Sequence, residues 1–296
     1  MSCRFGMGLS TIAIAAALAS ALATYAPPRA EAESPNVEEL NIVFARVDGV
    51  DLKLDLDRPS KGNEPFPVLM YIHGGGWYSG GKIACRNLLR TAARNGYAAV
   101  SVDYRLTGFP GNVEYSFPAQ VYDVKCAVRW LRANAVKYNL DPQKIAAVGF
   151  SSGGHLALLL ALTDKADGLE GEGPYEEYSS RVQAAVSSAG PIDLASLIQT
   201  TGSPYIEPFV GGTLRDVPYL YRRASPLTYA STAAPPILLI HGDRDTQVPL
   251  EQAKLLDRRL TELGVAHSVV IKKGYDHSAL YDEREVWDFL SGVLKK

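Results

Sequence analysis

Residues 149–153 read Gly-Phe-Ser-Ser-Gly, so glycines stand two positions before and two positions after a serine. They follow the apolar run 145–148 and precede a second apolar run, 156–162, whose length suits a helix. Between a strand and a helix this pattern is typical of a nucleophile elbow, a sharp turn that exposes the serine. Only small residues fit two positions on either side of that serine. The pattern therefore indicates Ser151, since a turn centred on Ser152 would place Phe150 where a small residue is needed.

A glycine run follows an earlier strand-like segment. Residues 73–77 read His-Gly-Gly-Gly-Trp, directly after the apolar run 68–72. Glycines let the backbone come close to a reacting group and point N–H groups at developing negative charge. We expect the amides of Gly74, Gly75 and Ser152 to form an oxyanion hole. The alternative is that the glycines only make a flexible turn.

Two polar segments near the C-terminus each follow a strand pattern. Residues 241–249 read His-Gly-Asp-Arg-Asp-Thr-Gln-Val-Pro, and residues 274–277 read Gly-Tyr-Asp-His. A serine hydroxyl needs a base to become a good nucleophile, and His277 is the predicted base. Asp243 and Asp245 are both candidates for the acid that orients it. The other four histidines fit other places, in the glycine run, one helical turn beyond the serine, and at strand ends: His73, His155, His241 and His267.

These motifs, with Asp103-Tyr104-Arg105-Leu106, make the chain resemble the α/β-hydrolase-fold esterases from about residue 38 onward. Within that fold it is similar to bacterial carboxylesterases and to feruloyl and acetylxylan esterases related to the hormone-sensitive-lipase group. The resemblance implies a serine, acid, histidine order along the chain and favours Asp245 as the acid. It also implies ester hydrolysis through an acyl-enzyme, without a metal or other cofactor.

Three features depart from the hormone-sensitive-lipase group. That group commonly has Asp before the serine and Ala after it, where this chain has Phe150 and Ser152. Residues 241–249 look more like the feruloyl-esterase and peptidase-like branches. No helical N-terminal cap is expected, because strand-like sequence begins almost at once. The departures favour short acyl groups or carbohydrate-linked acetyl or feruloyl esters over long-chain lipids.

Alternating strand and helix patterns predict a doubly wound, mostly parallel eight-stranded sheet with helices on both faces. The first two strands should form a hairpin at one edge. The predicted strands are residues 41–47, 50–57, 66–73, 97–104, 144–150, 183–189, 236–241 and 267–272. The predicted helices are residues 83–95, 118–139, 151–162, 250–263 and 279–294.

Two irregular insertions interrupt this alternation, at about residues 163–181 and 192–232. We expect both to lie at the carboxyl edge of the sheet, over the site. The second contains Tyr205 and Tyr219, which either shape the substrate pocket or pack on the surface.

Composition suits one large α/β domain, over residues 33–296. The chain has 296 residues, 47% of them hydrophobic, with a formal net charge of −2. This net charge does not indicate binding to nucleic acid or to an anionic membrane. The sequence has no P-loop, no Gly-x-Gly-x-x-Gly turn and no metal-type spacing of histidines. The expected partner is a small-molecule or polysaccharide-linked ester, and oligomeric state stays open.

Residues 1–32 resemble a secretory signal peptide. Arg4 precedes the uncharged, Ala-rich segment 9–26, and residues 30–32 read Ala-Glu-Ala, like a cleavage site. We therefore predict a secreted or periplasmic protein without stable membrane association after cleavage. The alternative is an uncleaved anchor, since residues 7–26 are just long enough to span a bilayer.

Beyond this segment the chain has two cysteines, Cys85 and Cys126. An oxidising compartment permits a disulfide. In this fold, however, the helices that carry them should pack on opposite faces of the sheet. We predict two free, mostly buried thiols.

Two other functions fit parts of the sequence. Amide hydrolysis, as in the peptidase and kynurenine-formamidase branches of the fold, is compatible with residues 241–249. A non-catalytic binding module is the second alternative, because some proteins of this fold have lost the triad. Comparing the hydrolysis of matched esters and amides distinguishes an amide hydrolase from an esterase. Labelling by a reactive-serine probe tests whether the chain is a non-catalytic module.

Overall fold

The computed structural model describes residues 36–62, 64–109, 111–278, 280 and 284–295, and it contains the predicted eight strands. Continuous apolar runs explain the central strands, which are buried on both faces. The strands are β1 (Asn36–Val47), β2 (Val50–Pro59), β3 (Phe66–Ile72), β4 (Ala98–Val102), β5 (Leu140–Phe150), β6 (Ala184–Ser188), β7 (Ile237–Gly242) and β8 (His267–Lys272).

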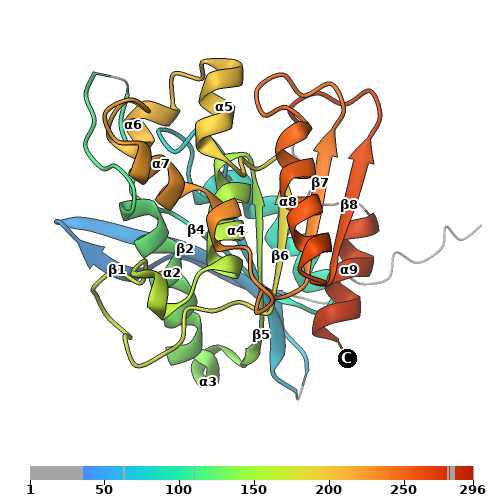
Figure 1. Ribbon diagram of the computed structural model, residues 1–296. Coiled ribbons are helices and arrows are strands. Elements are labelled where there is room, and N and C mark those ends of the chain that lie inside the picture. Colours follow the sequence, from blue (N-terminus) through green and yellow to red (C-terminus); the bar gives the residue numbers. More distant parts are fainter. Residues whose placement is uncertain (1–35, 63, 110, 279, 281–283, 296) are drawn as a thin grey trace, which may run out of the picture. The chain divides into compact units, whose positions relative to one another are not determined.

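One sheet contains all eight strands in the order β1-β2-β4-β3-β5-β6-β7-β8 (Figure 1). The β1–β2 hairpin lies at one edge and β2 pairs antiparallel with β4, while the other neighbours are parallel. The predicted mostly parallel sheet and its edge hairpin are confirmed. Because parallel strands share a direction, the loops after β3, β5, β7 and β8 meet at one edge.

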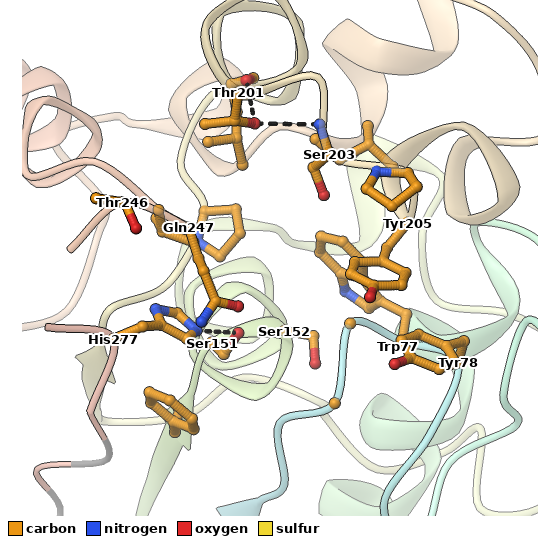
Figure 2. Close-up of a pocket in the computed structure, with 18 residues that line it drawn as sticks. Trp77, Tyr78, Ser151, Ser152, Thr201, Ser203, Tyr205, Thr246, Gln247 and His277 are labelled. Carbon is orange, nitrogen blue, oxygen red and sulfur yellow. Dashed lines mark hydrogen bonds between the residues drawn. The ribbon is translucent and has the colours of Figure 1, made fainter.

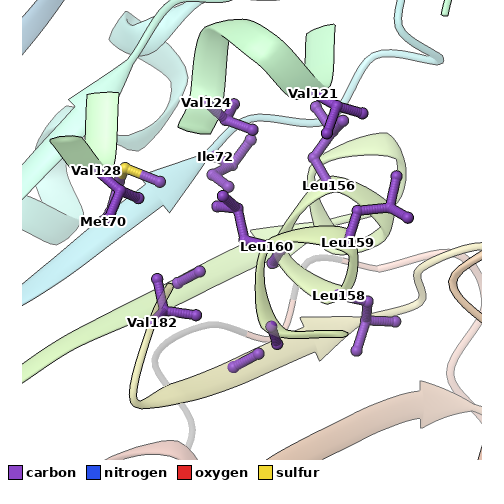
Figure 3. Close-up of a cluster of buried hydrophobic side chains, with 14 of the residues drawn as sticks. Met70, Ile72, Val121, Val124, Val128, Leu156, Leu158, Leu159, Leu160 and Val182 are labelled. Atoms are coloured by element: carbon purple, nitrogen blue, oxygen red, sulfur yellow. The ribbon is translucent and has the colours of Figure 1, made fainter. Parts of the chain in front are cut away.

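Helices cover both faces of this sheet, as predicted. Helices α2, α4 and α8 pack on one face, and α1 and α9 pack on the other. Figure 3 shows the first of these cores, where Leu156 and Leu160 of α4 lie beside Val121 and Val124 of α2. The helices and 3₁₀ turns are η1 (Lys82–Cys85), α1 (Arg86–Arg94), α2 (Ala119–Ala133), α3 (Ala135–Tyr138), α4 (Ser152–Leu162), η2 (Lys165–Asp167), α5 (Leu194–Thr201), α6 (Ile206–Val210), α7 (Pro218–Ala224), η3 (Pro226–Tyr229), α8 (Glu251–Glu262) and α9 (Arg284–Leu294).

The predicted helix 118–139 is interrupted. Asn134 separates α2 from α3, and its side-chain amide donates to the Trp130 carbonyl at 2.9 Å. An asparagine side chain that bonds the preceding turn competes with the regular helical ladder. None of the helices that the structure describes has the length and apolar character needed to cross a bilayer.

The two insertions lie at opposite edges of the sheet, so the prediction for residues 163–181 is wrong. That segment continues from the C-terminal end of α4, which lies at the amino edge, and it contacts α2 there through Lys125 and Arg132. Residues 192–232 continue from the carboxyl end of β6, fold into α5, α6, α7 and η3, and contribute to the cavity beside Ser151, as predicted.

Cys85 and Cys126 are free and buried, as predicted. Cys85 belongs to the core under α1 and α9, whereas Cys126 belongs to the core under α2 and α4. The sheet therefore separates the two thiols. The predicted signal segment, residues 1–32, lies outside the described residues.

Candidate active site

The turn between β5 and α4 holds Ser151 in an unusual backbone conformation, with φ 54° and ψ −124°. A Cβ at Gly149 would lie 2.1 Å from the Gly153 carbonyl oxygen, and a Cβ at Gly153 would lie 2.1 Å from the Ile72 carbonyl oxygen. Neither position has room for a side chain, as predicted from the two glycines on either side of Ser151. This strained backbone conformation leaves the Ser151 side chain accessible from the cavity that it lines.

His277 reaches this serine from the loop after β8. Its Nε2 lies 2.9 Å from Ser151 Oγ, and its ring packs on the Phe150 ring at a centroid distance of 4.8 Å. The loop depends on a close approach to β7 that the sequence motifs did not reveal. A Cβ at Gly242 would lie 2.4 Å from the Tyr275 carbonyl oxygen, so glycine at the end of β7 lets the two loops touch.

Asp245 is the carboxylate that contacts His277. Its Oδ2 lies 2.7 Å from His277 Nδ1, and its Oδ1 accepts the amides of Gln247 and Val248, each at 2.9 Å. Burial alone raises the pKa of this carboxyl, but hydrogen bonds from His241, His277 and the Val248 amide outweigh it and hold the pKa well below its usual range. Asp245 therefore carries a negative charge beside the imidazole at neutral pH.

Asp243, the other candidate acid, lies on the same loop but points elsewhere. It is exposed, and its Oδ1 accepts the Gly274 amide at 2.6 Å. This bond ties the loop after β7 to the loop after β8. Of the two acids, Asp243 shapes the loops and Asp245 meets the histidine.

The glycine loop after β3 lies against the elbow. A Cβ at Gly74 would lie 3.0 Å from the Phe150 carbonyl oxygen, and one at Gly75 would lie 2.2 Å from the Ser79 carbonyl oxygen. Gly75 also has φ 117°, a conformation that favours glycine. Ser152 begins α4, so its N–H has no intrahelical acceptor. The three predicted donors thus lie on two segments that meet at Ser151.

Tyr104 connects these two segments, a role that sequence reasoning missed. Its hydroxyl donates to the His73 carbonyl at 3.1 Å and lies 3.4 Å from Ser152 Oγ. Its ring also stacks on the His73 ring, with centroids 4.2 Å apart. The only signal was the position of Tyr104 just after a strand, in Asp103-Tyr104-Arg105-Leu106.

A cavity of about 440 Å³ opens beside Ser151 (Figure 2). Tyr205 lines it, whereas Tyr219 on α7 is 61% exposed and is not among the lining residues. The residues that line the cavity come from the glycine loop, the elbow, the insertion 192–232 and the two loops after β7 and β8: Gly75, Gly76, Trp77, Tyr78, Phe150, Ser151, Ser152, Pro191, Leu197, Thr201, Ser203, Pro204, Tyr205, Ile206, Thr246, Gln247, Val248 and His277.

The remaining histidines make structural contacts. His155 is buried, its Nε2 donates to the Ala224 carbonyl at 2.7 Å, and its Nδ1 accepts from Trp77 Nε1 at 3.3 Å. His241 Nε2 donates to the Val248 carbonyl at 2.6 Å, which holds the loop that carries the acid. In the part of the chain that the structure describes, no three His, Cys, Asp or Glu residues gather as a metal site would require.

Comparison with known proteins gives one family match, to BD-FAE over residues 54–260. Esterase LipC of Mycobacterium tuberculosis is 34% identical over 209 residues, which are 69% of this chain and 50% of that protein. Esterase LipQ of the same organism is 33% identical over 68% of this chain and 47% of its own length. This chain therefore spans about half the length of the curated relatives it matches.

Two solved structures match this chain over most of their own length. A truncated carbohydrate esterase from gut microbiota has a TM-score of 0.78 at 26% identity, covering 90% of this chain and 99% of that one. Propionate-bound esterase Est2 of Thermogutta terrifontis has a TM-score of 0.69 at 26% identity, covering 85% and 90%. The predicted α/β-hydrolase fold is confirmed.

Proposed function

Because the chain belongs to the BD-FAE family, we propose that it is a serine hydrolase of carboxylic esters. One observation carries the proposal: the buried Asp245 contacts His277 at 2.7 Å, and His277 contacts Ser151 at 2.9 Å where both of these residues line a cavity. The names of LipC, LipQ and the two esterase structures support the same reaction class.

In the proposed reaction His277 Nε2 takes the proton of Ser151 Oγ while that oxygen bonds to the ester carbonyl carbon. The carbon–oxygen bond to the alcohol then breaks, and His277 returns the proton to the leaving oxygen. Water, deprotonated by His277, attacks the acyl-serine, frees the carboxylic acid and restores Ser151. Asp245 holds the imidazole in place and stabilises its positive charge.

The negative charge on the carbonyl oxygen needs donors that are fixed before the reaction. We assign this role to the N–H groups of Gly74, Gly75 and Ser152, which lie on the two segments that meet at Ser151. Loss of one such donor typically costs about 10²- to 10³-fold in turnover.

The proposed substrates are short-acyl or carbohydrate-linked acetyl or feruloyl esters. A cavity of about 440 Å³ suits a small acyl group with part of its alcohol. The structural relatives described as a carbohydrate esterase and as a propionate-bound esterase support this class. The proposed place of action is outside the cytoplasm, supported by the signal-like residues 1–32. The N-terminal sequence of protein recovered from periplasm or medium tests this location.

Hydrolysis of p-nitrophenyl acetate, butyrate and octanoate tests the proposed reaction. We expect activity on the short esters and a loss of about 10⁴- to 10⁶-fold in Ser151→Ala. The matched variant Ser152→Ala keeps its backbone N–H and should lose no more than about tenfold. Activity that survives Ser151→Ala would contradict the proposal, and activity only on the matched p-nitroanilides would identify an amide hydrolase.

A further inference from the structure

The cavity has a polar flank, formed by Thr246 and Gln247. Both residues are exposed and follow β7, and in Figure 2 they lie on the same side of Ser151 as His277. The Gln247 amide N–H donates to Asp245 Oδ1, which fixes the backbone of this flank. A carboxamide and a hydroxyl can each donate and accept hydrogen bonds. This flank therefore suits a ligand that carries hydroxyl groups.

The opposite flank is aromatic and is formed by Trp77, Tyr78 and Tyr205 (Figure 2). The rings of Tyr78 and Tyr205 stack with centroids 4.6 Å apart and planes 12° apart. A Cβ at Gly76 would lie 3.1 Å from the Tyr78 ring and 3.3 Å from the Tyr205 ring. Glycine at this position lets both rings lie against the loop backbone, beside the predicted oxyanion donors.

Trp77 is the most rigidly held of the three residues of this flank. It is 3% exposed, and its indole stacks on Phe209 with centroids 4.2 Å apart. Its Nε1 donates to His155 Nδ1 at 3.3 Å. Packing, rather than the bound substrate, therefore fixes the width of the cavity on this side.

The proposed reaction orients an ester between the two flanks. The carbonyl oxygen must point to the amides at Gly74, Gly75 and Ser152, and the leaving oxygen must come within reach of His277 Nε2. The alcohol then extends along the flank that contains His277. The acyl group is left with the opposite flank, against the aromatic rings.

From this geometry we propose that Gln247 and Thr246 select the alcohol, while Tyr205, supported by Tyr78 and Trp77, selects the acyl group. The favoured substrate is an ester of a polyhydroxylated alcohol with a flat or unbranched acyl group. The inference rests on the proposed ester hydrolysis and assigns its specificity to named side chains.

Two substrate ratios test the assignment in the full chain. The alcohol ratio compares kcat/KM for glyceryl monoacetate with that for ethyl acetate. The acyl ratio compares kcat/KM for p-nitrophenyl butyrate with that for the branched p-nitrophenyl pivalate. Within one variant both rates scale with the amount of folded protein, so each ratio is independent of partial unfolding.

We expect Gln247→Ala to lower the alcohol ratio about tenfold and to leave the acyl ratio unchanged. Tyr205→Ala should lower the acyl ratio about tenfold, because the branched chain gains room, and leave the alcohol ratio unchanged. Tyr205→Phe keeps the ring and should keep the parent acyl ratio. Tyr219→Ala, on the exposed face of α7, is the matched control that should shift neither ratio.

The assignment is overturned if the two variants shift the opposite ratios, if each shifts both ratios, or if neither shifts its own. Absence of hydrolysis of all four esters by the parent chain is a separate outcome. That result rejects the proposed function itself. Hydrolysis by the parent chain, together with any of the three contrary shifts in the ratios, rejects only the assignment of the flanks.

Discussion

The two edges of the sheet use carboxylates in different ways. At the amino edge Glu170 accepts from Lys125 Nζ at 2.5 Å and from Arg129 Nη1 at 3.1 Å, so it neutralises cations that are buried in the fold. At the carboxyl edge Asp245 contacts His277, whose other nitrogen faces Ser151 beside an open cavity. Glu170 belongs to a buried ion-pair network, whereas Asp245, in the proposed reaction, stabilises a positive charge that forms on His277 only during turnover.

Cavity size alone does not separate the two edges. The cavity beside residues 163–181 is about 660 Å³, larger than the cavity of about 440 Å³ beside Ser151. The smaller cavity contains a serine in a strained turn and a histidine aligned with it. Geometry between side chains, rather than volume, distinguishes the candidate site. The predictions below test this contrast, from the largest expected effect to the smallest.

Asp245→Asn tests the carboxylate at the carboxyl edge. We expect kcat to fall by about 10⁴-fold, because the imidazole loses the charge that orients and stabilises it. Asp243→Asn is the matched control on the same loop and should keep kcat within about tenfold, since Asp243 bonds the Gly274 amide rather than the histidine. Steady-state hydrolysis of p-nitrophenyl acetate measures both. The reverse result would assign the acid to Asp243.

Glu170→Gln tests the carboxylate at the amino edge. The change leaves the fully buried Lys125 ammonium without its counter-charge, and we expect the free energy of unfolding to drop by about 3 kcal/mol. The kcat of the folded variant should not change. Urea unfolding at pH 7 measures the loss, and Glu177→Gln, an exposed acid on the same segment, should change stability by no more than about 0.5 kcal/mol. An activity loss without a stability loss would remove the contrast between the edges.

His155, which is buried against Trp77 of the aromatic flank, should make the stability of the protein depend on pH. Burial lowers the pKa of this imidazole to about 4, although its bond to the Ala224 carbonyl acts to raise it. Between pH 6.5 and 4 the unfolded chain therefore binds more protons at this residue than the folded chain does. The contribution of the neutral His155 side chain to the free energy of unfolding is fully present above pH 6.5. It should decrease by about 2 kcal/mol between pH 6.5 and pH 5.

Urea unfolding at several pH values measures this slope. His155→Gln removes the titrating group and should give a shallower dependence over the same range. An equal slope in the variant would show that other groups account for the acid sensitivity.

The motifs were enough to predict the candidate catalytic side chains because each motif depends on local backbone geometry. Gly149 and Gly153 follow from the steric needs of one turn, so five residues were enough to select Ser151. Parallel strands then bring the ends of β5, β7 and β8 to one edge. This is why residues as distant in sequence as Ser151 and His277 could be predicted to meet.

The errors concern segments whose position depends on packing between distant elements. Residues 163–181 look like a site-covering insertion by composition, but they leave the far end of α4 and pack on α2. The short helices α5, α6 and α7 were missed because their apolar residues bury against the rest of the core rather than in a long amphipathic pattern. The role of Gly242 likewise depends on a loop more than thirty residues away, which no local pattern encodes.

Tyr104→Phe tests the smallest effect, on the link between the two halves of the predicted oxyanion hole. The change keeps the ring that stacks on His73 and removes the hydroxyl that bonds the His73 carbonyl and faces Ser152 Oγ. We expect kcat to fall about tenfold with little change in KM, because oxyanion donors act mainly on the transition state.

A double-mutant cycle separates this positioning role from a general loss of packing. If Tyr104 acts partly through Ser152, adding Ser152→Ala to Tyr104→Phe should cost less than the two single losses combined. Additive losses, or a rise in KM at constant kcat, would instead mean that the hydroxyl supports the fold near the site without aligning its donors. Because the Ser152 hydroxyl replaces the alanine common in the hormone-sensitive-lipase group, the same cycle tests whether this departure contributes to the alignment.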